Sequence, residues 1–438
     1  MTNLEIGIWS FPVLLLMIFA RVPIGLAMFV TGFGGLWLVM GTPNMALGRL
    51  KTEAYTTFSN YSLSIVPMFL LMGYFATLGG MSQALFRAAA GFLGHRKGGV
   101  AMAAVGACAG FGAICGSSLA TAATMSRVAL PELRRFGYSG GFSTATLAAG
   151  GTLGILIPPS VVLVIYAILT EQNIAKLFLA AFVPGILAAI GYMAAISIYV
   201  RVNPGSAGVA EPVPMRERFR ALVDVWPVLL VFIAVVGGIY GGIFTPTEGA
   251  AVGALGTGII ALVNGGLTLR TLGDSFTATA KSTAMIFFIV LGAGFYNGFL
   301  ALTQVPQEMA RLVVEQGVSP WLVLVIILLL YLVFGCVMDS LSMILLTVPI
   351  FFPVISALDF GMSPEHVAIW FGILVLIVVE VGLITPPVGM NLFIINNMDR
   401  GTPMSATYRA VLYFVGSDIV RVAILVMFPA ITLFLIPE

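Results

Sequence analysis

Gly154-Ile-Leu-Ile-Pro-Pro-Ser160 breaks one apolar run of the sequence, and Gly382-Leu-Ile-Thr-Pro-Pro-Val388 breaks another about 228 residues later. A proline inside a helix removes a backbone N–H donor and stops the helix, so each passage predicts a broken helix. Each follows, by roughly forty residues, a polar interruption of a different apolar run: Gly116-Ser117-Ser118 in the first case and Met338-Asp339-Ser340 in the second. Matched helix breaks in two halves of a membrane protein are typical of a binding site near the middle of the bilayer.

The composition indicates a membrane protein. Hydrophobic residues make up 60% of the chain and charged residues 9%, with a mean hydropathy of +1.08, whereas soluble domains carry about 25% charged residues. Stretches such as 321–337 and 225–242 lack charge and are long enough to cross much of a bilayer. The three cysteines lie in apolar runs, which favours a packing role, and the basic residues form no nucleic-acid patch. No signal peptide is expected at the N-terminus. The sequence predicts an all-α polytopic membrane protein.

Three kinds of membrane element are predicted. Uninterrupted spans are expected over 5–20, 22–40, 58–79, 178–200, 224–243, 246–264, 278–302 and 407–436. Broken helices are expected over 139–170 and 364–397, around the two proline pairs. The stretches 98–135 and 319–357 are interrupted at their centres and predict re-entrant hairpins, because non-helical backbone at that depth must be buried in protein or line a wet cavity.

These elements occur twice in the same order. Residues 1–200 form one set and residues 224–438 the other, joined by a polar linker over 201–223. Each set contributes five crossings and one hairpin. Because five is odd, the second set starts from the opposite side of the membrane, and the two repeats are inverted in topology.

The distribution of charge predicts the orientation, since Lys and Arg gather in short cytoplasmic loops. Placing the basic linker in the cytoplasm puts both termini in the periplasm and most other Lys and Arg residues on the cytoplasmic side. The first hairpin is flanked by six basic residues and then enters from the cytoplasm. The second is flanked mainly by acidic residues and enters from the opposite face. Two mirror-related hairpins of this kind are typical of a secondary carrier.

The helix breaks also predict what is bound. Carbonyl and N–H groups at a break lose their intrahelical partners, and a cation such as Na⁺ satisfies the carbonyls while an anion satisfies the N–H groups. Glycines let backbone approach closely, and hydroxyl, carboxylate and amide groups add further ligands. The candidates are Gly154, Ser117 and Ser118 in the first half, and Gly382, Asp339, Ser340, Ser342, Thr385 and Asn391 in the second.

Structural interpretations of these residues remain open. Gly-Ser-Ser can serve small-residue helix packing, and a Pro-Pro pair can be a simple kink. A charge within a span is usually functional, so Asp339 is expected either to coordinate or support an ion or to hold a structural hydrogen bond.

Roles are also expected for further polar residues and for the tryptophans. Glu248 fits a structural role in the first turn of a helix. For Glu380, a role in helix packing and a role in the site are both open. Asp418 and Arg421 are expected to pair on one helix face. Trp9, Trp226 and Trp370 fall near proposed span ends, as interface anchors do.

Three motifs carry a resemblance to a known family. Gly242-Ile-Phe-Thr-Pro-Thr-Glu-Gly-Ala-Ala-Val252, Gly154–Ser160 and Gly382-Leu-Ile-Thr-Pro-Pro-Val-Gly-Met-Asn391 resemble motifs of the large membrane subunit of TRAP (tripartite ATP-independent periplasmic) transporters. The likeness covers essentially the whole chain. It departs from the family pattern only at Gly249, where the family often has Ala.

The resemblance implies an elevator-type carrier of a bacterial or archaeal inner membrane that imports organic acids with Na⁺. The substrate class would be C4-dicarboxylates, sialic acid or related carboxylates. A periplasmic substrate-binding protein delivers the substrate, and a small four-helix membrane subunit, here expected to be a separate polypeptide, completes the scaffold.

Site residues follow from the resemblance by position, with at least two Na⁺ ions expected. The first Na⁺ site would use Gly116, Ser117, Ser118, Gly154, Ile157 and Pro158, and the second Asp339, Ser340, Gly382 and Thr385. The substrate would lie between the hairpin tips, with Ser118, Asp339, Thr385 and Asn391 as candidate contacts.

Two other functions are weighed against this one. A stand-alone inverted-repeat Na⁺/anion carrier or a Na⁺/H⁺ antiporter would share the architecture but need no partner. An intramembrane hydrolase with Ser117 or Ser118 as nucleophile would need a base within hydrogen-bond reach, and neither histidine lies within a span. The chain is therefore not expected to be an enzyme.

Overall fold

A computed structural model describes residues 1–436, and within that range every regular element is a helix. The first half comprises α1 (Asn3–Phe19), α2 (Ile24–Met40), α3 (Asn44–Phe58), α4 (Ile65–Leu78), α5 (Met81–Leu93), α6 (Gly99–Cys115), α7 (Ser118–Arg135), α8 (Gly140–Leu156), α9 (Val161–Thr170) and α10 (Ile174–Val202). The second comprises α11 (Met215–Val223), α12 (Trp226–Phe232), α13 (Gly238–Tyr240), α14 (Pro246–Val263), α15 (Leu269–Thr303), α16 (Val305–Glu315), α17 (Pro320–Gly335), α18 (Ser340–Ser356), α19 (Pro364–Gly382), α20 (Met390–Met398), α21 (Met404–Met427) and α22 (Pro429–Leu433). Six of these described helices are long and apolar enough to cross a membrane, or up to eight when each bent pair counts as one span.

Helices and breaks lie within the ranges predicted for the two hairpins and the two broken helices, and re-entry into the membrane stays a prediction. The first hairpin is α6 and α7, which separate at Gly116 and Ser117, and the second is α17 and α18, which separate over 336–339. The first broken helix is α8 and α9, bent by 44°. The second is α19 and α20, separated by the segment that holds Pro386 and Pro387. The breaks lie at the prolines and glycines because these residues act on their own backbone.

Five features of the helices differ from the prediction. Helix α3 was not expected, since its basic and acidic residues lower its hydropathy below that of a span. Helix α15 begins at Leu269 rather than 278, because Thr268 caps a polar first turn. The predicted span 224–243 contains a π-helical turn, and the predicted span 407–436 is divided at Phe428, before the proline that opens α22. The linker also holds the short helix α11.

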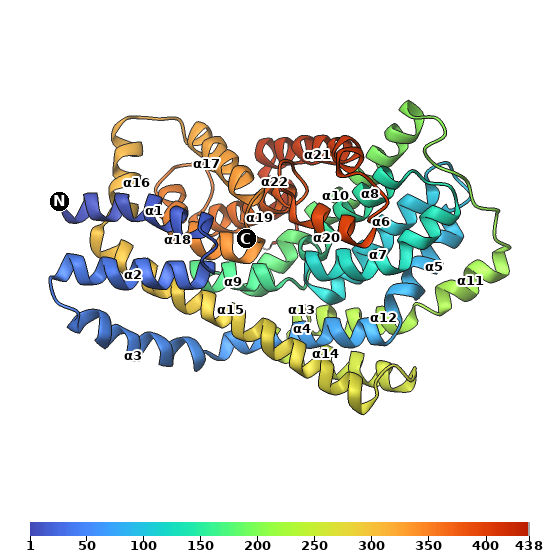
Figure 1. Ribbon diagram of the computed structural model, residues 1–438, viewed down its shortest axis with the longest axis horizontal. Helices are drawn as coiled ribbons and strands as arrows, with labels where there is room; N and C mark the ends of the chain where they lie inside the picture. Colours follow the sequence, from blue (N-terminus) through green and yellow to red (C-terminus); the bar gives the residue numbers. More distant parts are fainter. Residues whose placement is uncertain (437–438) are drawn as a thin grey trace.

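The helices form two packed groups (Figure 1). The hairpins and broken helices pack on one another, with α8 in contact with α6, α7, α20 and α21. A flanking group consists of α1, α2, α3, α4, α14 and α15, in which α15 packs against α2 and α4 against α14. The two groups meet where α4 contacts α6 and where α15 contacts α18.

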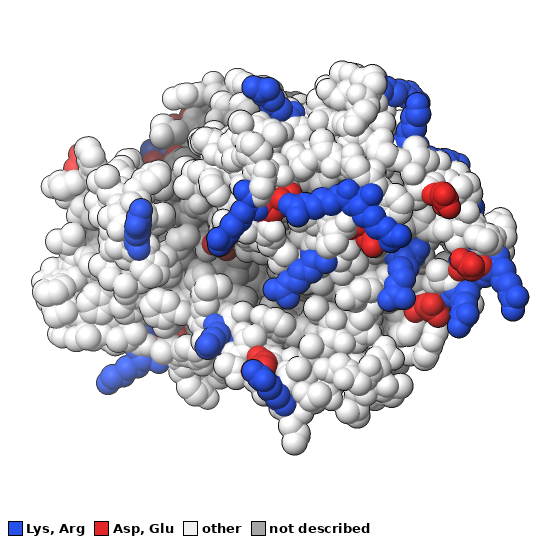
Figure 2. Space-filling model, turned by 45° about the vertical axis from the view of Figure 1, so that its right-hand side comes forward, with Lys and Arg blue, Asp and Glu red and all other residues white. Residues whose placement is uncertain are grey.

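Charge is unevenly spread over the ends of the molecule. In Figure 1 the right-hand end of the molecule carries α5 and α11. Figure 2 brings this end toward the viewer and shows that many Lys and Arg residues lie on the face in view. The other end carries the N-terminus and α16 in Figure 1. The face of the bundle seen in Figure 2 is therefore richer in basic than in acidic residues.

Two side-chain expectations are confirmed and one is wrong. Glu248 forms a capping box with Thr245 at the start of α14, and Arg421 lies 2.7 Å from Asp418. Trp9 and Trp226 are exposed, as interface anchors would be. Trp370 is fully buried and its Nε1–H donates to the carbonyl of Leu425 at 3.0 Å, so it is a packing residue of α19.

Candidate functional site

The tip of the first hairpin packs directly on the first helix break. A Cβ placed on Gly154 would lie 2.4 Å from Thr121 Oγ1 and 2.8 Å from the Ser117 carbonyl oxygen. A Cβ placed on Gly116 would lie 3.0 Å from the Pro159 carbonyl oxygen. Glycine at these positions therefore brings backbone and hydroxyl oxygens of α7, the tip and the break into one small volume.

One oxygen at this junction lacks a partner. Thr121 Oγ1 is buried and makes no hydrogen bond to the described residues, and a buried hydroxyl in that state costs free energy. Ser117 is the N-cap of α7, where its Oγ accepts from the Ala120 N–H at 3.4 Å. The atoms named at this junction that could act as metal ligands are all hydroxyl or carbonyl oxygens. Oxygen ligands of this kind suit a hard monovalent cation.

The tip of the second hairpin packs on the second break in a similar way. A Cβ placed on Gly382 would lie 2.5 Å from the backbone of Gly335 in α17. Across the same junction the Gly389 N–H donates to the Cys336 carbonyl at 3.3 Å. Asp339 is the N-cap of α18, and its Oδ2 accepts from the Ser342 N–H at 3.1 Å. The carboxylate that was expected to bind an ion therefore also holds a structural hydrogen bond.

Glu380 joins the two hairpin tips. Its side chain is fully buried near the end of α19. Ser340 Oγ donates to Glu380 Oε1 at 2.6 Å, and Ser118 Oγ donates to Glu380 Oε2. One carboxylate thus binds a hydroxyl from each hairpin. The sequence left Glu380 open between helix packing and a site role, and its place two residues before Gly382 was the signal that favoured the site.

A cavity of about 470 Å³ lies between the hairpin tips and the flanking helices. Ser117 and Ser118 line it from the first tip, and Asp339 and Ser340 line it from the second. The opposite wall consists of α4 and α15, with polar groups at Tyr74, Thr77 and Ser282. Of the four predicted substrate contacts, Ser118 and Asp339 line this cavity.

The other two predicted substrate contacts lie behind the tips. Thr385 Oγ1 donates to the Val381 carbonyl within its own helix turn at 2.6 Å. Asn391 is fully buried on α20, and its Nδ2 donates to the Ala148 carbonyl of α8 at 3.3 Å. Both residues hold backbone near the second break, and neither is among the residues that line the cavity.

Arg127 is a lining residue that sequence reasoning used only as evidence of orientation. It lies on α7, nine positions after Ser118, and its exposed side chain borders the cavity. Within residues 1–436 it forms no ion pair. A cation at the wall of a low-dielectric cavity attracts anions.

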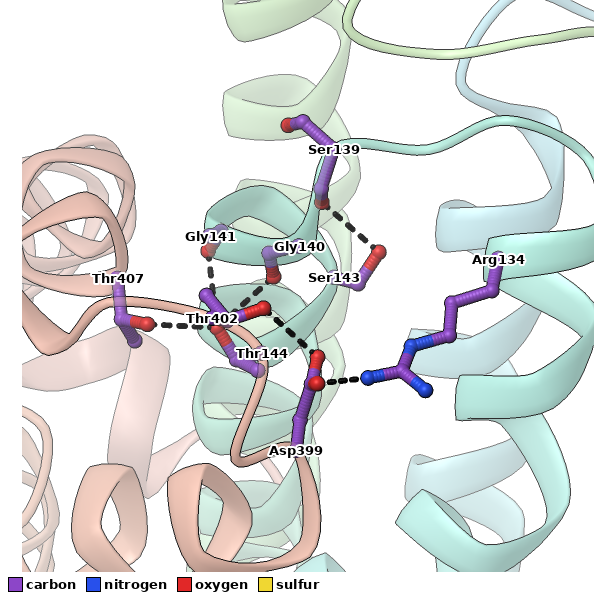
Figure 3. A network of polar contacts seen from close by, with 9 residues as sticks. All are labelled: Arg134, Ser139, Gly140, Gly141, Ser143, Thr144, Asp399, Thr402 and Thr407. Carbon is purple, nitrogen blue, oxygen red and sulfur yellow. Dashed lines mark hydrogen bonds and ion pairs between the residues drawn. The ribbon is translucent and has the colours of Figure 1, made fainter.

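A second polar network joins the two halves away from the cavity (Figure 3). Arg134, near the end of α7, pairs with the buried carboxylate of Asp399, which follows α20. Thr402 Oγ1 donates to Asp399 Oδ2 at 2.9 Å. Thr144 on α8 and Thr407 on α21 share a hydrogen bond of 2.8 Å. No local pattern signals these contacts, because Arg134 and Asp399 are 265 residues apart.

A third link between the halves lies in the interior. Tyr192 on α10 donates to Asp418 Oδ2 on α21 at 2.8 Å, and Asp418 also pairs with Arg421. The Tyr192 hydroxyl lies 2.9 Å from Thr152 Oγ1 on α8. Burying a charged pair requires such additional hydrogen bonds, because desolvation offsets most of the attraction.

Two hairpin tips that meet across a cavity in a polytopic helical protein define a membrane transport protein. The chain belongs to the family of the DctM component of tripartite ATP-independent periplasmic transporters, whose family model matches residues 11–431. The resemblance drawn from the three motifs is therefore confirmed.

Relatives support this assignment, and a solved structure shares the fold. The chain is 38% identical to the C4-dicarboxylate TRAP transporter large permease protein of Pseudomonas aeruginosa, over 91% of this chain and 92% of the relative. It is 30% identical to the sialic acid TRAP transporter large permease protein of Vibrio cholerae, with 96% of each covered. The crystal structure of the YdaH transporter of Alcanivorax borkumensis superposes with a TM-score of 0.65 at 15% identity, over 87% of this chain and 88% of that one, which shows a shared fold.

Proposed function

We propose that this chain is the membrane-spanning transport subunit of a Na⁺-coupled carrier that imports organic acids. The observation that carries the proposal is that residues of both hairpin tips line the same cavity, together with Arg127. Similar proteins are named for anionic substrates: C4-dicarboxylates, sialic acid and, in Oleidesulfovibrio alaskensis, isethionate. An acid that enters the cavity would place its charged group near Arg127 and the serine hydroxyls.

Na⁺ would bind where each hairpin tip meets a helix break, with at least two ions in all. The first site would use Gly116, Ser117, Ser118, Gly154, Ile157 and Pro158, and the unpartnered Thr121 hydroxyl supports a ligand there. The second would use Asp339, Ser340, Gly382 and Thr385. A cation beside Asp339 would offset the repulsion between that carboxylate and an acidic substrate. Na⁺ would thereby raise the affinity for the acid.

The moving part would be the hairpins with the broken helices, and the fixed part would be the flanking group of α1 to α4, α14 and α15. Hydrogen bonds and ion pairs connect the hairpins and broken helices of the two halves. These contacts favour movement of the hairpins and broken helices as one body. In this elevator mechanism the cavity wall formed by α4 and α15 stays in place. The basic end of the bundle would face the cytoplasm, with the linker on that side and both termini in the periplasm.

Two protein partners complete the proposed transporter. The family is one component of a tripartite system, so a periplasmic binding protein would supply the substrate and a small four-helix membrane subunit would join the flanking group. The permease of Oleidesulfovibrio alaskensis has 64% of its length covered by this chain, which leaves room there for a fused second subunit.

The test is uptake by the reconstituted complex with a labelled dicarboxylate or sialic acid. Accumulation should require both an inward Na⁺ gradient and the cognate binding protein. Uptake that is indifferent to Na⁺ would overturn the coupling. Full uptake by this chain without a binding protein would instead favour the stand-alone carrier.

A further inference from the structure

A basic cavity lies at the end of the bundle, apart from the site between the hairpin tips. It has a volume of about 670 Å³ and is lined by Arg96 and Lys97, which precede α6, and by Arg201 in the last turn of α10. All three side chains are exposed at its rim. Among the described residues none of the three forms an ion pair with an acidic group. Three unpaired cations around one cavity favour an anionic ligand.

The cavity is a fixed part of the fold. A Cβ placed on Gly98 would lie 3.0 Å from Ile196 Cγ2, so the start of α6 is packed closely on α10. The linker that forms one wall is held at both sides: the Ser139 N–H donates to the Ser206 carbonyl at 2.9 Å, and the Ala210 N–H donates to the Gly94 carbonyl at 3.1 Å. The three cations are therefore held near one another by hydrogen-bonded and packed backbone.

An apolar stripe runs along α10 to this cavity. Apolar residues are exposed at every fourth position of the helix and wind slowly around its axis: Ile186, Ile190, Ala194, Ile198 and Val202. The isoleucines and Val202 are each half or more exposed. A helix of 29 residues is about 43 Å long and crosses a whole bilayer. Arg201 and Val202 therefore lie at the depth of lipid headgroups, while the rest of the stripe, from Ile186 to Ile198, lies at the depth of acyl chains.

We propose that this cavity binds the phosphate headgroup of an anionic phospholipid, with an acyl chain along the α10 stripe. Basic pockets between membrane helices at the cytoplasmic side recognise such headgroups by charge. Free inorganic phosphate has the same headgroup chemistry, but the adjoining apolar stripe favours a ligand that also carries a chain. The bound lipid would connect the base of the first hairpin, through Arg96 and Lys97, to the end of α10.

The test uses the delipidated full-length chain in neutral detergent. Native mass spectrometry would count bound dioleoyl phosphatidylglycerol and dioleoyl phosphatidylcholine, and thermal unfolding would be followed with each lipid and with inorganic phosphate. The wild type should retain phosphatidylglycerol and not phosphatidylcholine. Its unfolding temperature should rise with phosphatidylglycerol only. The variant R96Q/K97Q/R201Q should bind it on the order of a hundredfold more weakly, about fivefold for each cation removed.

A charge-matched control is R216Q/R220Q/R270Q, which removes three exposed cations elsewhere at the basic end. This control should bind phosphatidylglycerol as the wild type does. Equal loss in the control, equal binding of phosphatidylcholine, or equal stabilisation by inorganic phosphate would each overturn the assignment. If the triple variant does not fold, R201Q alone should still weaken binding about fivefold, and unchanged binding by it would refute the site.

Discussion

Glu380 should be the residue through which the two hairpin tips stabilise each other. In Glu380→Ala both serine hydroxyls lose their acceptor, and each hydrogen bond to a charged group contributes roughly 1.5–3 kcal/mol. The two bonds together predict a loss of about 3–6 kcal/mol in the free energy of unfolding. Glu380→Gln should cost much less, because an amide still accepts from one serine and donates to the other, whose hydroxyl can turn to accept.

The assay is equilibrium unfolding of the purified chain in detergent, arranged as a double-mutant cycle with Ser340→Ala. If the carboxylate binds Ser340 as described, Ser340→Ala should cost about 1.5–3 kcal/mol less in the Glu380→Ala background than in the wild type. The control is Glu365→Ala, which breaks an exposed pair with Lys176 and should cost under about 1 kcal/mol. Additivity of Ser340→Ala and Glu380→Ala within about 0.5 kcal/mol would refute the reasoning.

Three further predictions concern the cavity and the helix breaks. Arg127→Gln should raise the KM for an acidic substrate about tenfold through a lost charge-assisted bond and leave kcat nearly unchanged. Arg135→Gln loses an exposed pair with Glu132 and a cation–π contact with Phe136, both away from the cavity, and should alter neither; equal kinetics of the two variants would contradict a substrate role. Asp339→Asn should unfold like the wild type because asparagine caps as well as aspartate, whereas Asp339→Ala should lose about 1 kcal/mol; both should reduce Na⁺-driven uptake, and wild-type uptake in either would exclude an ion-site role. Gly154→Ala should lower the free energy of unfolding by about 1–3 kcal/mol because its Cβ would overlap Thr121. Gly416→Ala, with open space around it, should raise the free energy of unfolding slightly. Similar unfolding of the two variants would show that the contact between the hairpin tip and the helix break is not tightly packed.

The sequence predicted the parts of the fold that are determined locally. Proline pairs and glycines act on their own backbone, so both broken helices and both hairpins lie where those residues stand. The same logic did not predict α3, because its charged residues lower its hydropathy below that of a span. In the structure Arg49 Nη2 donates to the Gly294 carbonyl of α15 at 3.1 Å, which gives this charged helix a packing partner.

Contacts between distant segments could not be predicted in this way. Ser118 and Glu380 are 262 residues apart, and no periodicity connects them. A single buried carboxylate also admits several roles until its neighbours are known. The error at Trp370 has the same origin: its position in α19 suggested an interface, but Trp321 of the second hairpin and Phe360 pack on its ring.

The links between the two halves bear on how the cavity can open. Three of them are Arg134 with Asp399, Ser118 with Glu380, and the Tyr166 hydroxyl donating to the Ala368 carbonyl at 2.6 Å. A first hairpin that opened alone would break at least the first two of these, and two bonds to charged groups represent roughly 3–6 kcal/mol. A cost in this range shifts a two-state equilibrium by about two to four orders of magnitude. Movement of the hairpins and broken helices together against α4 and α15 breaks none of the three links, so we expect that motion, rather than a local gate, to expose the cavity on the two sides of the membrane.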